Sequence, residues 1–175
     1  MKKSISTVLL IAMIVFGAQA QQKIGYFDAN YVMPQLPEAK AAQTELKTYA
    51  TKLQEDLATK EQEFKEKYQK YLQEATTMPD PTREAYEKEL QALQKQIADF
   101  QQSAEKSIQE KQQALMNPIY VKVENTLKEV AKANGYAYII RREALLYEPE
   151  GGKDDISPLV LKKLGITPAP VTDNK

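Results

Sequence analysis

Residues 72–90 read LQEATTMPDPTREAYEKEL, and the middle of this stretch is where one long helix must end and another can begin. A residue that precedes proline is pushed out of the helical region, so Pro79 and Pro81 stop the first helix. Asp80 is a good N-cap, and Pro81 suits the first helical position because its missing N–H leaves no hydrogen bond unmade there. Residues 78–81 are therefore predicted to form the tip of a helical hairpin.

The chain on both sides of this tip is helical by composition and by the spacing of its apolar residues. From Glu38 to about Thr77 it lacks Gly and Pro and repeats apolar residues at steps of three and four. The same spacing returns after Asp80 and continues past Pro118, which is expected to kink the second helix, until Gly135 ends it. Two helices of this length predict a mainly α fold.

The two apolar stripes also match each other. If the chain folds back at the tip, facing residues have numbers that sum to about 158, and the stripes keep this register along their length. Two unrelated amphipathic helices need not do so, and we therefore predict an antiparallel coiled-coil hairpin. In the first helix the predicted stripe consists of Ala39, Ala42, Leu46, Tyr49, Leu53, Leu57, Phe64, Tyr68, Tyr71 and Ala75.

A period of two replaces the helical spacing outside the hairpin. It predicts short strands at residues 23–30, 136–140 and 144–147, with a turn at 141–143 between the last two. A short helix follows, with Ser157 as its N-cap. The predicted fold class is therefore mainly α with a small β body, in which a long antiparallel α-helical hairpin arm extends from a small β-sheet.

This organisation divides the chain into segments with different roles. We assign residues 21–37 and 117–165 to a β-sheet oligomerisation body, 38–116 to the hairpin arm, and 166–175 to a disordered tail. So small a body is marginally stable alone, and its strands leave unpaired edges that further copies of the chain would cover. The residues expected at this association surface are Ile24, Tyr26, Tyr136, Tyr138 and Ile140.

Residues 1–20 have the pattern of a secretory signal peptide. Lys2 and Lys3 precede an apolar run over residues 8–16, and small residues precede a cleavage point after Ala20. The run is shorter than the roughly 20 residues that span a bilayer, and no second run follows, so no transmembrane segment is expected in the mature chain. With no cysteine to carry a lipid, the mature protein is expected in the periplasm of a two-membrane bacterium.

Charge and composition exclude several classes of function. Without Lys2 and Lys3 the chain has 22 basic and 24 acidic residues, a formal charge of −2, which does not indicate binding to nucleic acid. Cysteine and histidine are both absent. This excludes the usual Ser/His/Asp and Cys/His nucleophilic arrangements and the common zinc sites, so neither an enzyme nor a metal site is predicted. An enzyme would have to rely on carboxylates, lysines or tyrosines.

Two short polar motifs have a functional and a plain interpretation. Arg141 and Arg142 could receive a phosphate or a lipid head group, but with Glu143 beside them they favour a turn. Asp154 and Asp155 could suggest a calcium loop, but the spaced oxygen ligands and the final bidentate Glu of that motif are missing. Both motifs are therefore assigned to loops.

The arm carries large aromatic side chains that allow two interpretations. They can fill the seam between the helices, or they can stay partly exposed, because a two-helix seam cannot fully bury side chains of about 150–250 Å². Exposed aromatic area on the arm would contact an apolar client protein. The candidates for this role are Phe64, Tyr68, Tyr71, Tyr86 and Phe100.

Both ends of the mature chain carry a specific pattern. Residues 23–28 read KIGYFD, and PEAK at residues 37–40 starts the first helix. NPIY stands at residues 117–120, YAYII at 136–140 follows the second helix, and DIS at 155–157 precedes the last helix. Together with the hairpin between them, these features resemble the Skp/OmpH family of periplasmic chaperones over essentially the whole mature chain.

The resemblance implies a homotrimer, with a β-sheet body assembled from all three chains and three helical arms that enclose a cavity. It implies an ATP-independent holdase that binds unfolded outer-membrane β-barrel proteins and prevents their aggregation without a cofactor. Binding of lipopolysaccharide is left open, because the best-known members are strongly basic and this chain is near neutral. The alternative is a structural or adaptor role, in which the hairpin docks as a spacer onto the helices of another cell-envelope protein.

Overall fold

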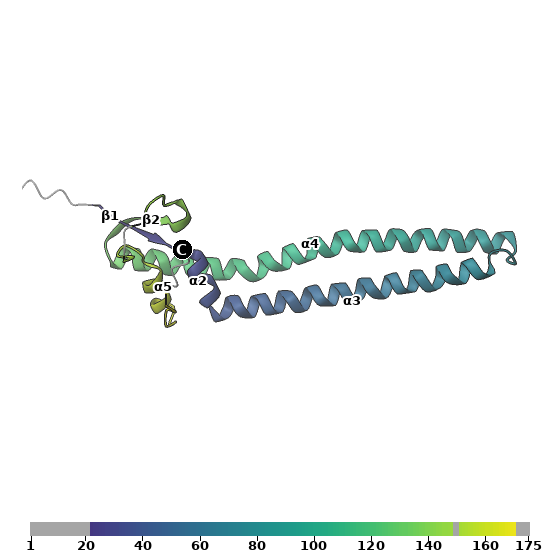
Figure 1. Ribbon diagram of the computed structural model, residues 1–175, viewed down its shortest axis with the longest axis horizontal. Coiled ribbons are helices and arrows are strands. Elements are labelled where there is room, and N and C mark those ends of the chain that lie inside the picture. The colour runs from purple at the N-terminus through teal and green to yellow at the C-terminus, as the bar shows by residue number, and fades with distance from the viewer. Residues whose placement is uncertain (1–21, 149–150, 171–175) are drawn as a thin grey trace, which may run out of the picture. The chain divides into compact units, whose positions relative to one another are not determined.

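The computed structural model describes residues 22–148 and 151–170 of the chain. The predicted signal peptide and the last five residues of the predicted tail lie outside these residues. The chain forms two compact units (Figure 1). Met33–Glu124 is called the arm unit here, and Met1–Val32 with Asn125–Lys175 is called the body unit.

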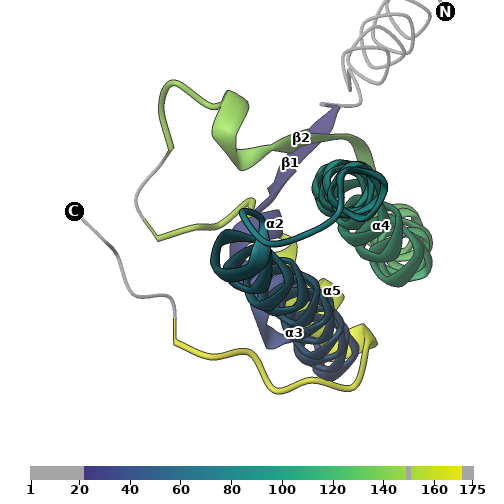
Figure 2. The same cartoon turned by 90° about the vertical axis from the view of Figure 1, so that its right-hand side faces the viewer.

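Two long antiparallel helices make up most of the arm unit. A short 3-10 turn, η1, covers Met33–Gln35, α3 spans Pro37–Glu74, and α4 spans Asp80–Ala133 and continues into the body unit. The two helices lie side by side in Figure 1 and are seen nearly end-on in Figure 2. At a rise of about 1.5 Å per residue α3 is about 57 Å long. Gly135, with a φ of 71°, ends α4 in the predicted left-handed conformation.

The chain reverses at the predicted tip, with the start of α4 shifted by one residue. A turn at residues 75–77 follows α3 and is closed by hydrogen bonds from the N–H groups of Thr77 and Met78 to the Glu74 carbonyl, at 2.9 and 3.0 Å. The Pro79 carbonyl then accepts the first hydrogen bonds of α4, from the N–H groups of Thr82 and Arg83, both at 3.0 Å. The Asp80 carboxylate contacts the Arg83 guanidinium at 2.5 Å instead of capping the helix, so the N-cap prediction was one residue too late.

Polar contacts between α3 and α4 reveal the register of the hairpin. Lys111 contacts Glu45 at 2.6 Å, and the Tyr71 hydroxyl donates to the Glu87 carboxylate at 2.6 Å. Two further ion pairs join Lys67 to Glu89 and Lys122 to Glu38. The residue numbers of these four pairs sum to between 156 and 160, so the predicted register is confirmed.

The seam departs from the predicted stripe after Phe64. The next inward position is three rather than four residues further on, so Lys67 lies half-buried in the seam and Tyr68 lies outside it, 44% exposed. The aliphatic stem of a lysine can be buried while its ammonium group stays at the edge, and that of Lys67 reaches Glu89. The placement of Tyr68 in the stripe was therefore wrong.

The body unit is built around a two-stranded parallel sheet. β1 spans Lys23–Phe27 and pairs with β2, which spans Tyr136–Arg141. α2 at Ala29–Val32 follows β1 and packs against α5 at Ser157–Lys163. The apolar residues that have no exposed surface in this unit are Val32, Ile156, Val160 and Leu161. The mainly α fold with a small β body is thus confirmed. No helix among the described residues is long and apolar enough to cross a membrane.

Residues 144–147 do not form the predicted third strand. A 3-10 turn, η2, covers Arg142–Ala144, and the chain then bends at Leu146, which is fully exposed, while Tyr147 is 79% exposed. β1 offers this segment no free edge, because β2 occupies one side and residues 154–156 occupy the other. A strand needs a hydrogen-bonded neighbour, and the described part of the chain does not supply one here.

Ser157 starts α5 without capping it. Its hydroxyl accepts a hydrogen bond from the Asp28 N–H at 2.8 Å, and its own N–H donates to the Asp155 carboxylate at 2.8 Å. The predicted capping role was therefore wrong, because a buried backbone donor distant in the sequence uses the hydroxyl instead.

Candidate functional site

The arm presents a stacked aromatic pair at the edge of its seam. The rings of Phe64 and Tyr68 are parallel to within 10°, with centroids 5.9 Å apart. Phe64 is half-buried and supports the more exposed ring of Tyr68. The pair therefore offers accessible aromatic surface on α3.

The other three predicted aromatic residues, Tyr71, Tyr86 and Phe100, are half-buried along the hairpin. The hydrogen bond to the Glu87 carboxylate raises the pKa of Tyr71, because it favours the protonated phenol. The ammonium group of Lys60 lies 5.5 Å from the ring centroid of Phe100. These contacts agree with a structural role for the three residues in the seam, and their contact with a client stays a prediction.

Tyr86 also lines a hollow of about 400 Å³ on the arm. Glu63, Glu66, Lys67 and Lys70 form much of its wall. Two acidic and two basic residues leave this hollow without a net charge, so it offers no particular attraction to an ionic ligand.

Most of the predicted association residues are accessible on the body unit. Ile24 is 49% exposed, Tyr138 58% and Ile140 37%. Tyr136 is half-buried, and the Lys23 ammonium lies 3.9 Å from its ring centroid. The two strands therefore keep apolar side chains on the surface of the single chain.

Tyr26 differs from the rest of that group because it is buried in the single chain, with only 3% of its surface exposed. It has little area to offer to a second copy. Leu146 and Tyr147 are more exposed than any residue of the group. Both residues fall in the predicted strand at 144–147 and outside the predicted association surface, although two consecutive large apolar residues beside a polar loop are a usable signal for an exposed apolar surface.

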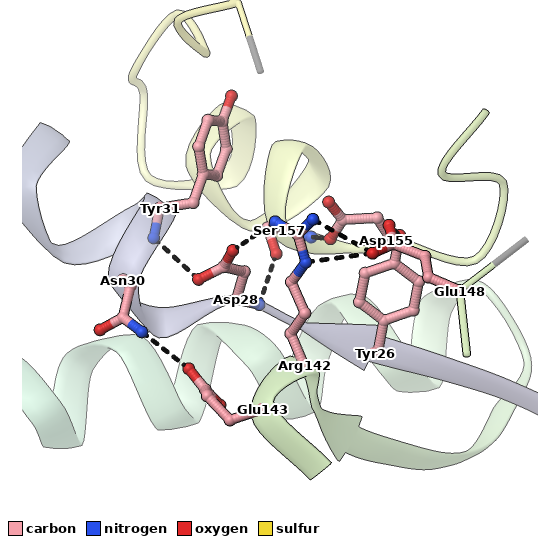
Figure 3. Close-up of polar contacts among 9 residues, drawn as sticks. All are labelled: Tyr26, Asp28, Asn30, Tyr31, Arg142, Glu143, Glu148, Asp155 and Ser157. Carbon is pink, nitrogen blue, oxygen red and sulfur yellow. Dashed lines mark hydrogen bonds and ion pairs between the residues drawn. The ribbon is translucent and has the colours of Figure 1, made fainter. Parts of the chain in front are cut away.

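A polar cluster lies beside β1, and Arg142 is at its centre (Figure 3). Its guanidinium contacts Asp28 at 2.8 Å and Glu148 at 3.1 Å. Asp28 is buried and also accepts the Tyr31 N–H at 2.9 Å, while the Tyr26 hydroxyl donates to Glu148. The cluster thus joins the chain after β1, η2 and the segment after it.

The chemistry of this cluster suits structural support and not catalysis. Burial, followed by the hydrogen bond to Glu148, raises the pKa of Tyr26. The hydrogen bond to Asp28 is the main cause that raises the pKa of Arg142, so both groups stay protonated near neutral pH. Two carboxylates already neutralise Arg142, which does not favour the alternative of an anion site. Among the described residues, no group of His, Cys, Asp and Glu is placed to hold a metal ion.

The sequence pattern at both ends of the chain and the long hairpin between them can be compared with known families. A family model for outer membrane proteins described as OmpH-like matches residues 23–164. The chain belongs to this OmpH-like family. The match includes β1, both long helices, β2 and α5, so the resemblance seen in the sequence is confirmed.

The OmpH-like fold is also found in a solved structure. A protein from Caulobacter crescentus, described as a candidate OmpH-like outer membrane chaperone, is similar to this chain with a TM-score of 0.73 at 17% sequence identity. The similarity covers 88% of this chain and 94% of that chain, which shows that the two share a fold. No curated protein matches the sequence.

Proposed function

We propose that this OmpH-like chain is an ATP-independent holdase chaperone of the periplasm. It binds unfolded outer-membrane β-barrel proteins in a cavity between helical arms and prevents their aggregation. The observation that carries the proposal is the accessible Phe64–Tyr68 stack on the arm. Membership of the OmpH-like family and the name of the Caulobacter crescentus protein support a chaperone role.

The nature of the client explains why an apolar arm surface is useful. A membrane-barrel strand alternates apolar and polar residues, and in water its apolar face promotes aggregation until it reaches the membrane. An aromatic ring supported by a long helix can bury such side chains without a closely matched pocket. Holding of this kind needs neither a nucleotide nor a catalytic group.

We further infer that three copies associate through the body. Ile24, Tyr138 and Ile140 expose apolar area on the two strands, and the adjoining Leu146 and Tyr147 add to it. A body of this size gains stability when such surfaces are covered by other copies. Association of three bodies brings three arms together, which is what a shared cavity requires.

Light scattering from a denatured barrel protein diluted into buffer tests the proposed function. The purified chain is expected to keep the scattering low without any nucleotide. Tyr68→Ser should lose a large part of this protection, whereas Lys65→Ser, also exposed on α3, should retain it. Circular dichroism checks that both variants stay helical. Aggregation that proceeds unchanged in the presence of the parent chain would contradict the proposal and favour the structural or adaptor role.

A further inference from the structure

The end of the hairpin away from its tip holds an apolar groove that the predicted sites do not include. Its volume is about 470 Å³, and η1, α3 and α4 all contribute to it. Ligand pockets in proteins commonly have volumes of about 300–1,000 Å³. This arm groove is lined mainly by Met33, Pro34, Leu46, Leu115, Met116 and Tyr120.

Small side chains on α3 leave the space that forms the arm groove. Ala39 and Ala42 form part of the wall and fill little of the gap between the helices. Tyr120 on α4 is 53% exposed, so the groove opens to the surface of the arm unit beside an accessible ring. Met33 and Met116 are flexible and can adapt to side chains of different shape. The groove is therefore suited to a large apolar side chain without strict shape selection.

The charges around the groove favour an anionic neighbour for that side chain. Among the described residues that line it, Lys40 is the one charged group, and it has no ion pair with another described residue. The nearby carboxylates of Glu38 and Glu45 are each paired, with Lys122 and Lys111 respectively. An apolar groove with one uncompensated ammonium group complements an apolar group that stands next to a carboxylate.

We propose that the arm groove binds a large apolar side chain of the unfolded client, with an acidic residue of the same client segment facing Lys40. This inference rests on the proposed function and gives it a specific contact point. The flexible lysine side chain can reach a carboxylate one or two positions from the residue that enters the groove. Client segments that combine aromatic and acidic residues are therefore held in preference to segments that are only apolar.

The methionines of the described chain report on this contact directly. Met33 and Met116 line the groove, whereas Met78 lies at the tip of the hairpin and serves as an internal control. The probe is an acetylated, amidated Thr-Phe-Asp-Phe-Thr peptide added to the whole chain carrying ¹³C-methyl methionine. We expect NMR shifts of the Met33 and Met116 methyl signals and none at Met78.

Variants of the groove and of the peptide separate the apolar from the ionic contribution. Ala39→Phe fills the groove and should abolish the methyl shifts, while Ala41→Phe, an exposed position outside the lining, should leave them intact. A peptide with Asn in place of Asp should bind about two- to fivefold more weakly, as expected for one exposed ion pair. Lys40→Gln should bring the two peptides to the same affinity.

Several outcomes would overturn the inference. These are unshifted Met33 and Met116 signals, equal shifts at Met78, or an Ala39→Phe variant that binds the peptide as the parent does. A change of oligomeric state in Ala39→Phe would show that a second copy covers the groove, which also contradicts the proposal. The proposed function is judged separately by client aggregation. If the parent chain prevents aggregation while the groove methyl signals stay unshifted, only the groove proposal fails.

Discussion

Gly25 in β1 lies close to Tyr136 and to the backbone of Asp154. A Cβ at this position would lie 2.6 Å from Cε1 of Tyr136 and 3.0 Å from the carbonyl oxygen of Asp154. The ring can tilt away, but the carbonyl belongs to the segment that runs along β1. We expect Gly25→Ala to lower the free energy of unfolding by about 1–3 kcal/mol, measured by urea denaturation and circular dichroism. The double variant Gly25→Ala/Tyr136→Ala should lose less unfolding free energy than the sum of the losses in the two single variants. An unchanged midpoint for Gly25→Ala would show that the strand has room for a methyl group.

The buried hydroxyl of Tyr26 is expected to make stability depend on pH in the alkaline range. An unfolded phenol ionises near pH 10, and burial raises the pKa of Tyr26 in the folded chain above that value. The unfolded state therefore loses this proton first. The contribution of Tyr26 is complete below about pH 10 and falls as the pH rises further.

Thermal unfolding of the parent and of Tyr26→Phe at several alkaline pH values measures this effect. Phenylalanine has no ionisable hydroxyl group, so above about pH 10 the melting temperature of the variant should fall less than that of the parent. Tyr147→Phe is the matched control, since Tyr147 is 79% exposed and is not buried in the body unit. Parallel curves for the parent and Tyr26→Phe would contradict the account.

At the scale of elements, the two long helices can be shortened together because their register is known. A deletion that begins near Ala50 and ends near Ile108 removes facing residues in pairs and takes the Phe64–Tyr68 stack with them. We expect the shortened chain to keep the oligomeric state of the parent, measured by light scattering, and to lose most of its protection of a denatured barrel protein. Full protection by the shortened chain would show that the arm is not the holding surface.

The hairpin could be predicted because its information is local. Pro79 and Pro81 end the first helix whatever tertiary contacts the rest of the chain makes. The matching apolar stripes of the two helices then specify the register of the hairpin. The third strand could not be predicted correctly, since the alternation at residues 144–147 does not say whether a partner edge is free. The step from Phe64 to Lys67 was missed because a lysine stem counts as polar in an apolar pattern.

The candidate site was predictable only as a set of residue types. Aromatic residues on the arm can be found in the sequence, but a step of three or four decides whether a ring faces the seam or the solvent. The burial of Tyr26 depends on residues 154–156 returning along β1 from far along the chain. The arm groove has no sequence motif, because it arises where Ala39 and Ala42 face larger residues on another helix.

At the scale of the whole molecule, the balance of charge decides how a client is attracted. The arm unit has 13 basic and 16 acidic residues, and some of them pair with each other, as Lys111 does with Glu45. The acidic residues offset the positive charge, so the arm has no net positive field to steer a client, and in physiological salt any local field decays over a Debye length of about 8 Å. Apolar contact is then the main attraction, and the affinity for a client should depend only weakly on ionic strength.

The most direct test is the dissociation constant of a denatured barrel protein at low and high salt, for the parent, Tyr68→Ser and Lys65→Gln. We predict that the constant of the parent changes by less than about threefold between roughly 0.05 and 0.5 M salt. We also predict that the tyrosine change weakens binding more than the lysine change does. A collapse of binding at high salt, or a larger loss from Lys65→Gln, would contradict the claim that this arm holds its clients by apolar contact.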